Sequence, residues 1–332
     1  MFSVFSIFIQ SVSSDSNGNG NVLYVGKGQT YNDIQDAVDA AGENDTVFVY
    51  NGTYTENIIV NSSIALIGEN VSTTVIDGGY NTSVVLISAS NVTLENFTIK
   101  HSKIGVYLGD TKGVFNCSIN GNFIVNCTNG LYIDNSSDNN LSFNSIVDNA
   151  DGINLYKSKN NKILNNSITH NAPYSTHGIA LWDESKGNNI SNNKIYGSRI
   201  GVLLNRWCND NFLWNNNVSK NVYGMNVEYS FFNIISNNSF NNRDHGVFLT
   251  SCNNNSVIGN TFTGHQFSAV YLVDSDDNNV VDNDYYDNKE DVKKASTPPS
   301  IKLPGFEMII FIVLVLIVLI FVLYKEKSIN KR

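Results

Sequence analysis

The 332-residue sequence has little charge, little proline and few cysteines, and each shortage excludes a class of protein. Charged residues make up 15% of the chain and hydrophobic residues 42%, a balance that does not fit a disordered chain. The formal charge of −9 argues against a nucleic-acid partner, which would need basic stripes. The four cysteines form no CxxC pair and no zinc-ligand spacing. The sequence therefore predicts a folded domain that is neither a zinc protein nor a nucleic-acid binder.

The two ends of the chain differ in composition from its body. Residues 306–324 are apolar apart from Glu307, and at about 1.5 Å per residue they nearly span a ~30 Å hydrocarbon layer. The basic tail at 325–332 then lies in the cytoplasm, so we expect a transmembrane helix that anchors an extracellular body at the cell surface. Residues 1–21 look like the remnant of a signal peptide and a polar leader, with a first strand as the alternative.

A sequence motif of about 23 residues recurs along the body of the chain, and a regular repeat of this length indicates a solenoid. Copies of the motif begin with a glycine, at Gly130, Gly152, Gly178, Gly201, Gly224 and Gly246. Two apolar residues one position apart follow each glycine, which is the period-two pattern of a short half-buried strand. Next come a small residue (Ser136, Ser158, Ser185, Cys208, Ser230, Cys252, Ser275) and two asparagine columns, one through Asn139, Asn161 and Asn188 and the other through Asn144, Asn166 and Asn193.

Three short strands separated by turns predict one coil of a right-handed, single-stranded parallel β-helix, so the fold class is all-β. Coils that stack at about 4.8 Å place equivalent residues in columns, with apolar columns in the interior. We expect the asparagines at the corners, because asparagine tolerates left-handed backbone and its stacked amides can hydrogen-bond along the ladder. Residues 47–288 then form about ten coils and a rod of about 50 Å.

The remaining segments complete the predicted organisation. Residues 22–46 should cap the open end of the solenoid with a short helix that places Ile34, Ala37, Val38 and Ala41 on one face. Residues 289–305 read as a polar linker to the membrane segment.

The run VGKGQTYNDIQDAVDAAGENDTVFVYNGTYTENIIVNSSIALIGE resembles the opening of NosD-like proteins of the pectin-lyase superfamily. The repeats resemble the β-helix repeats of that family, which are also called carbohydrate-binding and sugar-hydrolysis repeats. The resemblance covers about residues 22–288 and implies the fold. It implies no single activity, because members include enzymes, metal-associated proteins and surface proteins of no known activity.

A second resemblance lies in Pro304, Gly305 and Phe306, directly before the apolar span. The tripeptide in this place is similar to the PGF-CTERM sorting signal of archaeal surface proteins. It implies that an archaeosortase-like enzyme removes the tail and that a lipid anchor replaces it; a plain transmembrane anchor is the alternative.

Potential N-glycosylation sites are frequent, as an Asn- and Ser-rich chain produces by chance. N-x-S/T sequons begin at Asn44, Asn51, Asn61, Asn70, Asn81, Asn91, Asn96, Asn116, Asn126, Asn135, Asn140, Asn165, Asn189, Asn217, Asn237 and Asn254. We expect a minority to carry glycan, because those in the corner columns would be buried.

One surface patch stands out as a candidate ligand site. In the two coils that begin at Gly178 and Gly201, one extra residue precedes the column of small residues. This extra residue predicts a widened corner. The candidate residues there and on neighbouring outward positions are Tyr156, Trp182, Asp183, Glu184, Arg206, Trp207, Glu228 and Tyr229. Rings stack on sugar faces and charges select uronates, so we expect a polysaccharide or glycan ligand; an ordinary solvated surface is the alternative.

The case for an enzyme is weaker than the case for a binding, adhesive or structural envelope protein. Polygalacturonase-like members need close carboxylates with His and Arg-x-Lys motifs, and alginate-epimerase-like members carry Asp-Pro-His-Asp; neither set is present. The alternative is a polysaccharide lyase or glycoside hydrolase of the same fold, which a compact acidic cluster with Ca²⁺ and a nearby Arg or Lys would favour.

A third hypothesis is a copper-handling protein, but the sequence contains few of the soft side-chain ligands that bind copper. Met225 and Met308 are the only methionines besides Met1. His177 and His245 share a column three coils apart, about 14 Å, too far to bind one metal. Two coils, about 9.6 Å, separate Cys208 from Cys252, beyond the ~7 Å limit for a disulfide. Nothing in the sequence decides whether Cys117 and Cys127 pair, and we expect no metal site and no cofactor.

Overall fold

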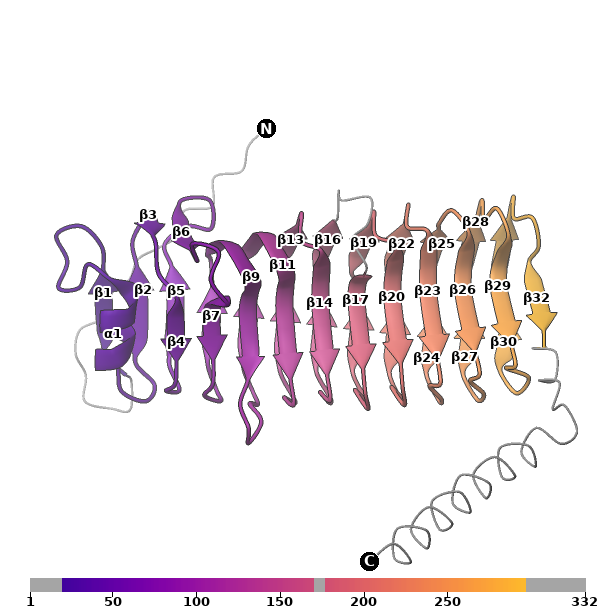
Figure 1. Ribbon diagram of the computed structural model, residues 1–332, viewed down its shortest axis with the longest axis horizontal. Helices are drawn as coiled ribbons and strands as arrows, with labels where there is room; N and C mark the ends of the chain where they lie inside the picture. The colour runs from indigo at the N-terminus through magenta and orange to yellow at the C-terminus, as the bar shows by residue number, and fades with distance from the viewer. Residues whose placement is uncertain (1–19, 170–176, 297–332) are drawn as a thin grey trace, which may run out of the picture. The chain divides into compact units, whose positions relative to one another are not determined.

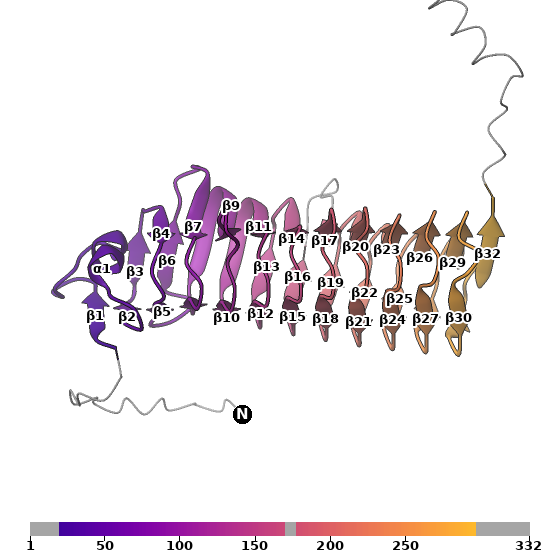
Figure 2. The same ribbon diagram turned by 90° about the horizontal axis from the view of Figure 1, so that it is seen from below.

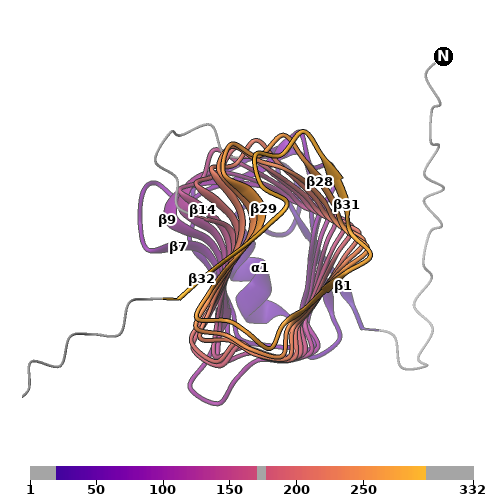
Figure 3. The ribbon, with the colours of Figure 1, turned by 90° about the vertical axis from the view of Figure 1, so that its right-hand side faces the viewer.

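A computed structural model describes residues 20–169 and 177–296 of the chain. This part is an all-β, right-handed parallel solenoid with one short helix, as predicted. Figures 1 and 2 show its coils side by side, with α1 (Ile34–Ala40) at the β1 end. Figure 3 looks along the axis and shows successive coils superposed.

Each coil contributes strands to three faces, which we name A, B and C. Face A consists of β1 (Val22–Val25), β2 (Thr46–Val49), β5 (Ala65–Gly68), β8 (Thr93–Glu95), β10 (Ser118–Asn120), β12 (Asn140–Ser142), β15 (Lys162–Leu164), β18 (Asn189–Ser191), β21 (Phe212–Trp214), β24 (Ile234–Ser236), β27 (Ser256–Ile258) and β30 (Asn279–Val281). Face B consists of β3 (Gly52–Tyr54), β6 (Thr74–Asp77), β13 (Ser145–Val147), β16 (Ser167–Thr169), β19 (Lys194–Tyr196), β22 (Asn217–Ser219), β25 (Ser239–Asn241), β28 (Thr261–Thr263) and β31 (Asp284–Tyr286).

Face C carries the longer strands. It consists of β4 (Ile58–Val60), β7 (Ser83–Ile87), β14 (Asp151–Tyr156), β17 (His177–Trp182), β20 (Ile200–Asn205), β23 (Tyr223–Glu228), β26 (His245–Thr250), β29 (Ser268–Val273) and β32 (Val292–Ala295). Strands β9 (Thr98–Gly109) and β11 (Phe123–Asp134) run from face B onto face C.

The solenoid has about twelve turns, more than the ten expected, because face A holds twelve parallel strands. The estimate started at residue 47 and missed β1, which pairs with β2 and adds a turn before the helix. At the other end β32 pairs with β29, so strand pairing continues past residue 288 to Ala295. Helix α1 buries Ile34, Ala37 and Val38, as its sequence pattern predicted.

Segments at both ends lie outside the described residues. These are residues 1–19 and 297–332, which include the predicted membrane span at 306–324, the basic tail and the sorting tripeptide of Pro304, Gly305 and Phe306. Within residues 20–169 and 177–296, no helix is long and apolar enough to cross a membrane.

The predicted apolar columns fill the interior. Ile153 pairs with Ile179, and Ile179 with Val202, and none of the three is more than 1% exposed. The glycine before each pair allows the coils to approach closely. A Cβ at Gly178 would lie 2.4 Å from Cγ2 of Ile195 and 2.6 Å from the carbonyl oxygen of Gly201, so a side chain would force the coils apart.

The asparagine columns form buried hydrogen-bonded ladders, as predicted. Oδ1 of Asn161 accepts the backbone N–H of Asn139 at 3.0 Å and its side-chain Nδ2 at 3.0 Å. Asn161 in turn donates to Oδ1 of Asn188. These bonds satisfy backbone and side-chain groups that are fully buried, and an unpaired group there would cost about 1–3 kcal/mol.

The prediction that the ladder asparagines themselves adopt left-handed backbone is wrong. In most coils the left-handed residue is the one before the ladder asparagine: Asp138 (φ 59°) precedes Asn139, and Asn160 (φ 55°) precedes Asn161. The corner therefore needs two residues with separate tasks, one that turns the chain and one that points inward. A third ladder, which the sequence analysis missed, runs through Ser198, Asn221, Asn242, His265 and Asn288.

Candidate functional site

The candidate site lies on face C and at the corner that follows it. Trp182 pairs with Tyr156 in the preceding coil and with Asn205 in the next, as the column pattern predicted. All three point outward, because the residues before them, such as Leu155 and Leu181, are buried in the core.

The corner beside Trp182 is wider than its neighbours. Asp183 and Glu184 both have positive φ, at 42° and 65°, and so do Arg206 and Trp207 in the next coil, at 61° and 59°. At the equivalent corner of the preceding coil, Lys157 (φ 51°) is followed directly by the buried Ser158. The extra residue predicted from the sequence therefore adds a second left-handed residue, which turns more side chains toward solvent.

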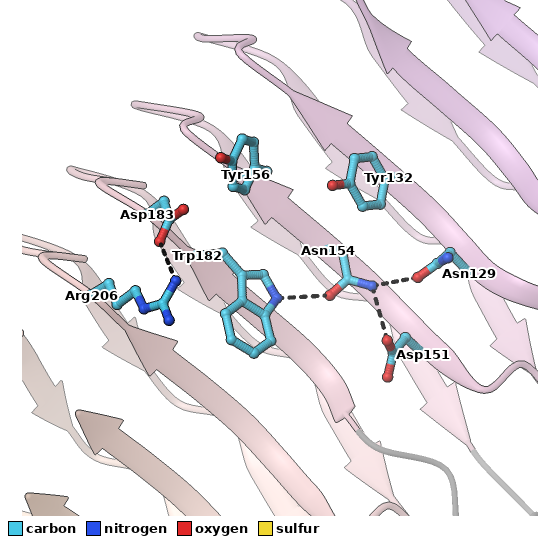
Figure 4. Close-up of a pocket in the computed structure, with 8 residues that line it drawn as sticks. All are labelled: Asn129, Tyr132, Asp151, Asn154, Tyr156, Trp182, Asp183 and Arg206. Atoms are coloured by element: carbon cyan, nitrogen blue, oxygen red, sulfur yellow. Dashed lines mark hydrogen bonds and ion pairs between the residues drawn. The ribbon is translucent and has the colours of Figure 1, made fainter. Parts of the chain in front are cut away.

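A groove of about 300 Å³ opens on face C beside this corner (Figure 4). Tyr156, Trp182, Asp183 and Arg206 line it together with four residues that the sequence analysis did not single out as site residues: Asn129, Tyr132, Asp151 and Asn154. The signal for these four was available, because they occupy outward positions of β14, which pairs with β17, and of β11, which pairs with β14.

Hydrogen bonds on face C fix the indole of Trp182. Its Nε1 donates to Oδ1 of Asn154 at 3.3 Å, and Nδ2 of Asn154 donates to Oδ1 of Asn129 at 2.6 Å and to Oδ2 of Asp151 at 3.3 Å. The ring of His177 packs edge-on against the indole with centroids 5.5 Å apart. The indole is thus held in one orientation at the groove before any ligand arrives.

A second hollow of about 310 Å³ lies over the corner itself. Lys157, Asp183, Glu184, Arg206 and Trp207 line it, so Asp183 and Arg206 separate the two hollows. The indole of Trp207 is 56% exposed. A planar ring beside a carboxylate and a guanidinium suits a sugar, which presents both an apolar face and hydroxyl groups.

Two predicted site residues line neither hollow. Glu228 lies one coil further on, where its Oε2 accepts a hydrogen bond from Nδ2 of Asn205 at 2.6 Å. Tyr229 is 53% exposed at the next corner, which has the ordinary width. The structure therefore brings six of the eight candidates together and leaves these two at the margin.

The groove and its margin contain a hydrogen-bond-donating phenol and one carboxylate–imidazole pair. Burial, with the charge of Asp134 second, raises the pKa of Tyr132 further above neutral pH, and its protonated phenol can donate a hydrogen bond. The best acid–base pair is Asp151 and His177, whose Oδ1 and Nδ1 are 3.2 Å apart.

The sequence profile described as "Periplasmic copper-binding protein (NosD)" matches residues 8–202 and 174–302, which is most of the chain. The chain belongs to the NosD family. The columns, the capped N-terminal end and the parallel coils are thus features of a NosD-family β-helix.

This NosD-family chain is also similar to one protein over part of its length and to solved structures at low sequence identity. A cell surface glycoprotein of Methanothermus fervidus is 32% identical over 111 residues, which are 33% of this chain and 18% of that protein. Among solved structures, a mutant of DFA-IIIase of Arthrobacter chlorophenolicus in complex with DFA-III superposes with a TM-score of 0.67 at 16% identity, covering 87% of this chain and 88% of that one. The A-module of a mannuronan C-5 epimerase of Azotobacter vinelandii gives 0.62 at 15% identity, covering 80% and 95%. At these identities the structures show a shared fold alone.

The described residues do not fit the copper that the family's description names. Residues 20–169 and 177–296 contain no group of three or more His, Cys, Asp or Glu side chains that could hold a metal ion. The histidines there are engaged singly, as in the contact of His245 with Ser268 and of His265 with Asn288. All four cysteines are free and buried, and burial raises the thiol pKa to about 11 in Cys117 and about 12 in Cys208, whereas copper binds the thiolate.

Proposed function

We propose that this NosD-family chain is an exported cell-surface protein, anchored at its C-terminus, that binds a polysaccharide or glycan in the face C groove. The positioned indole of Trp182 carries the proposal. The ring is fixed by Asn154 on one side of a groove whose other walls offer tyrosines, carboxylates and a guanidinium. Such a groove provides a stacking surface and converging polar groups, the combination that small-molecule sites use.

The surface location rests on three supports. These are the apolar span and basic tail of the sequence, the periplasmic description of the family, and the similarity to a cell surface glycoprotein of Methanothermus. The PGF-like tripeptide at 304–306 adds processing by an archaeosortase-like enzyme to the proposal. Intact-mass analysis of the native protein tests this step, because the residues after the tripeptide are lost if the tail is removed.

A polysaccharide lyase or hydrolase is the second candidate, and the Asp151–His177 pair favours it. This pair adjoins the indole that would hold the sugar, and a carboxylate can orient an imidazole for proton transfer. Release of reducing or unsaturated sugar ends by the protein, lost in His177→Ala, would establish the enzyme; binding without turnover favours the lectin-like role.

A glycan array with the purified full-length chain tests the binding proposal, followed by titration of the best glycan. We expect Trp182→Ala to abolish measurable binding. The matched control is Trp214→Ala, which removes an indole of 38% exposure on face A and should leave the affinity unchanged. Equal losses in both variants, or no glycan bound by the parent protein, would reject the groove as a glycan site.

A further inference from the structure

The sequons are distributed unevenly around the solenoid. Beyond residue 135 they begin at Asn140, Asn165, Asn189, Asn217, Asn237 and Asn254. Each of these lies on face A, on face B or at a corner of face A. No sequon begins on β14, β17, β20, β23, β26, β29 or β32, the strands of face C that are described beyond that point. Face C from β14 onward is therefore free of potential N-glycosylation sites, whereas Asn126 within β11 and Asn135 directly after it are sequons beside the groove.

Three of these sequons share the two-residue corner described above. Asn165, Asn237 and Asn254 have positive φ of 56°, 54° and 59°, and all three are exposed. The middle residue of each sequon is a buried ladder asparagine, and the serine is the first residue of β16, β25 or β27. The acceptor amide at the corner therefore faces solvent. The next residue in the sequence is a buried asparagine that the hydrogen bonds of the ladder hold in place.

This arrangement reverses the expectation that corner sequons are buried. The buried asparagines are the ladder residues, which follow the acceptors in the sequence, so the ladder bonds do not consume the acceptor amides.

Two other sequons begin within strands of face A and not at its corners. Asn140 and Asn189 lie within β12 and β18, and in both the side-chain oxygen is buried. Nδ2 of Asn140 donates to Oγ of Ser142 at 3.1 Å, which is the serine of its own sequon. An enzyme that must reach both the amide and the hydroxyl would have to open this strand first.

We propose that N-linked glycans occupy the corner acceptors Asn165, Asn237 and Asn254, that Asn140 and Asn189 remain bare, and that face C from β14 onward is left clear. The donor is a lipid-linked oligosaccharide. The amide Nδ2 forms a bond to the anomeric carbon, the bond from that carbon to the lipid phosphate breaks, and the amide loses one proton. This proposal does not depend on whether the groove binds glycan.

Glycopeptide mass spectrometry tests the assignment on the full chain, made in a host that transfers lipid-linked oligosaccharides to N-x-S/T sites. We expect glycan at the three corner acceptors and none, or below a tenth of their occupancy, at Asn140 and Asn189. Bare corners beside an occupied strand site, or equal occupancy at all five, would overturn it.

A grafted site tests the corner rule separately. Lys157 is a left-handed corner residue followed by the buried Ser158, so the double change Lys157→Asn and Lys159→Thr copies the corner geometry beside face C. We expect this variant to gain one glycan, and the matched single change Lys157→Asn, which creates no sequon, to gain none. A double variant that folds with the parent's melting temperature and stays bare would show that the corner geometry does not select acceptors.

Discussion

Asp183 and Arg206 occupy the same corner position in successive coils, and Oδ1 of the aspartate lies 3.7 Å from Nη1 of the arginine. The arginine side chain is 65% exposed, and exposed ion pairs contribute about 0–1 kcal/mol to stability. The pair therefore does little to hold the coils together. Its place between the two hollows suits it to hold charge beside a ligand.

Arg206→Ala should separate binding from stability. We expect the melting temperature to stay within about 2 °C of the parent, while glycan affinity falls about tenfold or more, since hydrogen bonds to a charged group contribute about 1.5–3 kcal/mol. Calorimetric titration at two salt concentrations measures the effect. A variant that unfolds earlier but binds normally would assign the arginine a structural role.

Asn188→Ala tests the ladders that join the coils. Oδ1 of Asn188 accepts from both the backbone N–H and Nδ2 of Asn161, so its loss leaves two buried donors unpaired. We expect a loss of about 2–4 kcal/mol in the free energy of unfolding, measured with urea. The matched control is Asn189→Ala, the adjacent residue, whose side-chain oxygen has no partner in the described residues and whose loss should cost under about 0.5 kcal/mol.

The fold could be predicted from the sequence because the chain repeats. Equivalent positions of successive coils have the same surroundings, so each column contains residues of similar type. Ile153, Ile179 and Val202 were placed correctly on this ground. The corner was harder to predict. Asn160 and Asn161 are adjacent and chemically identical, and only the backbone tells which of them turns the chain and which joins the ladder.

The candidate site was predicted less completely than the fold. The extra residue at Asp183 and Glu184 gave the widened corner, since spacing is visible in the sequence. Asn154 was missed because its role arises from contacts between coils: it reaches Trp182 in the coil above and Asn129 in the coil below. Such contacts follow from the strand register, which the repeat implies, but the side-chain directions come only from the structure.

The four cysteines should behave as buried, unreactive thiols. Burial raises the thiol pKa to about 11 in Cys117, Cys127 and Cys252 and to about 12 in Cys208, so almost no thiolate exists at pH 8. We expect negligible labelling of the native protein by a thiol-specific disulfide reagent within an hour, and four equivalents after unfolding in urea. Two equivalents after unfolding would indicate a Cys117–Cys127 disulfide, and rapid native labelling would contradict their burial.

His265 should make the stability of the solenoid depend on pH. It takes the place of an asparagine in the third ladder, where its Nε2 accepts the backbone N–H of Asn242 at 3.4 Å and its Nδ1 lies 2.7 Å from Oδ1 of Asn288. This bonding needs the neutral imidazole, and burial lowers the pKa of His265 from its usual value. As the pH falls below about 6.5, the unfolded chain binds a proton that the folded chain does not, so the free energy of unfolding decreases.

The matched variant is His265→Asn, which restores the residue found on either side in the ladder and cannot titrate. We expect the melting temperature of the parent to fall between pH 7 and pH 5 and that of the variant to fall less. Some pH dependence should remain, because burial also lowers the pKa of His245. Parallel curves for parent and variant would show that His265 is protonated as readily in the folded chain as in the unfolded one, and would contradict its place in the ladder.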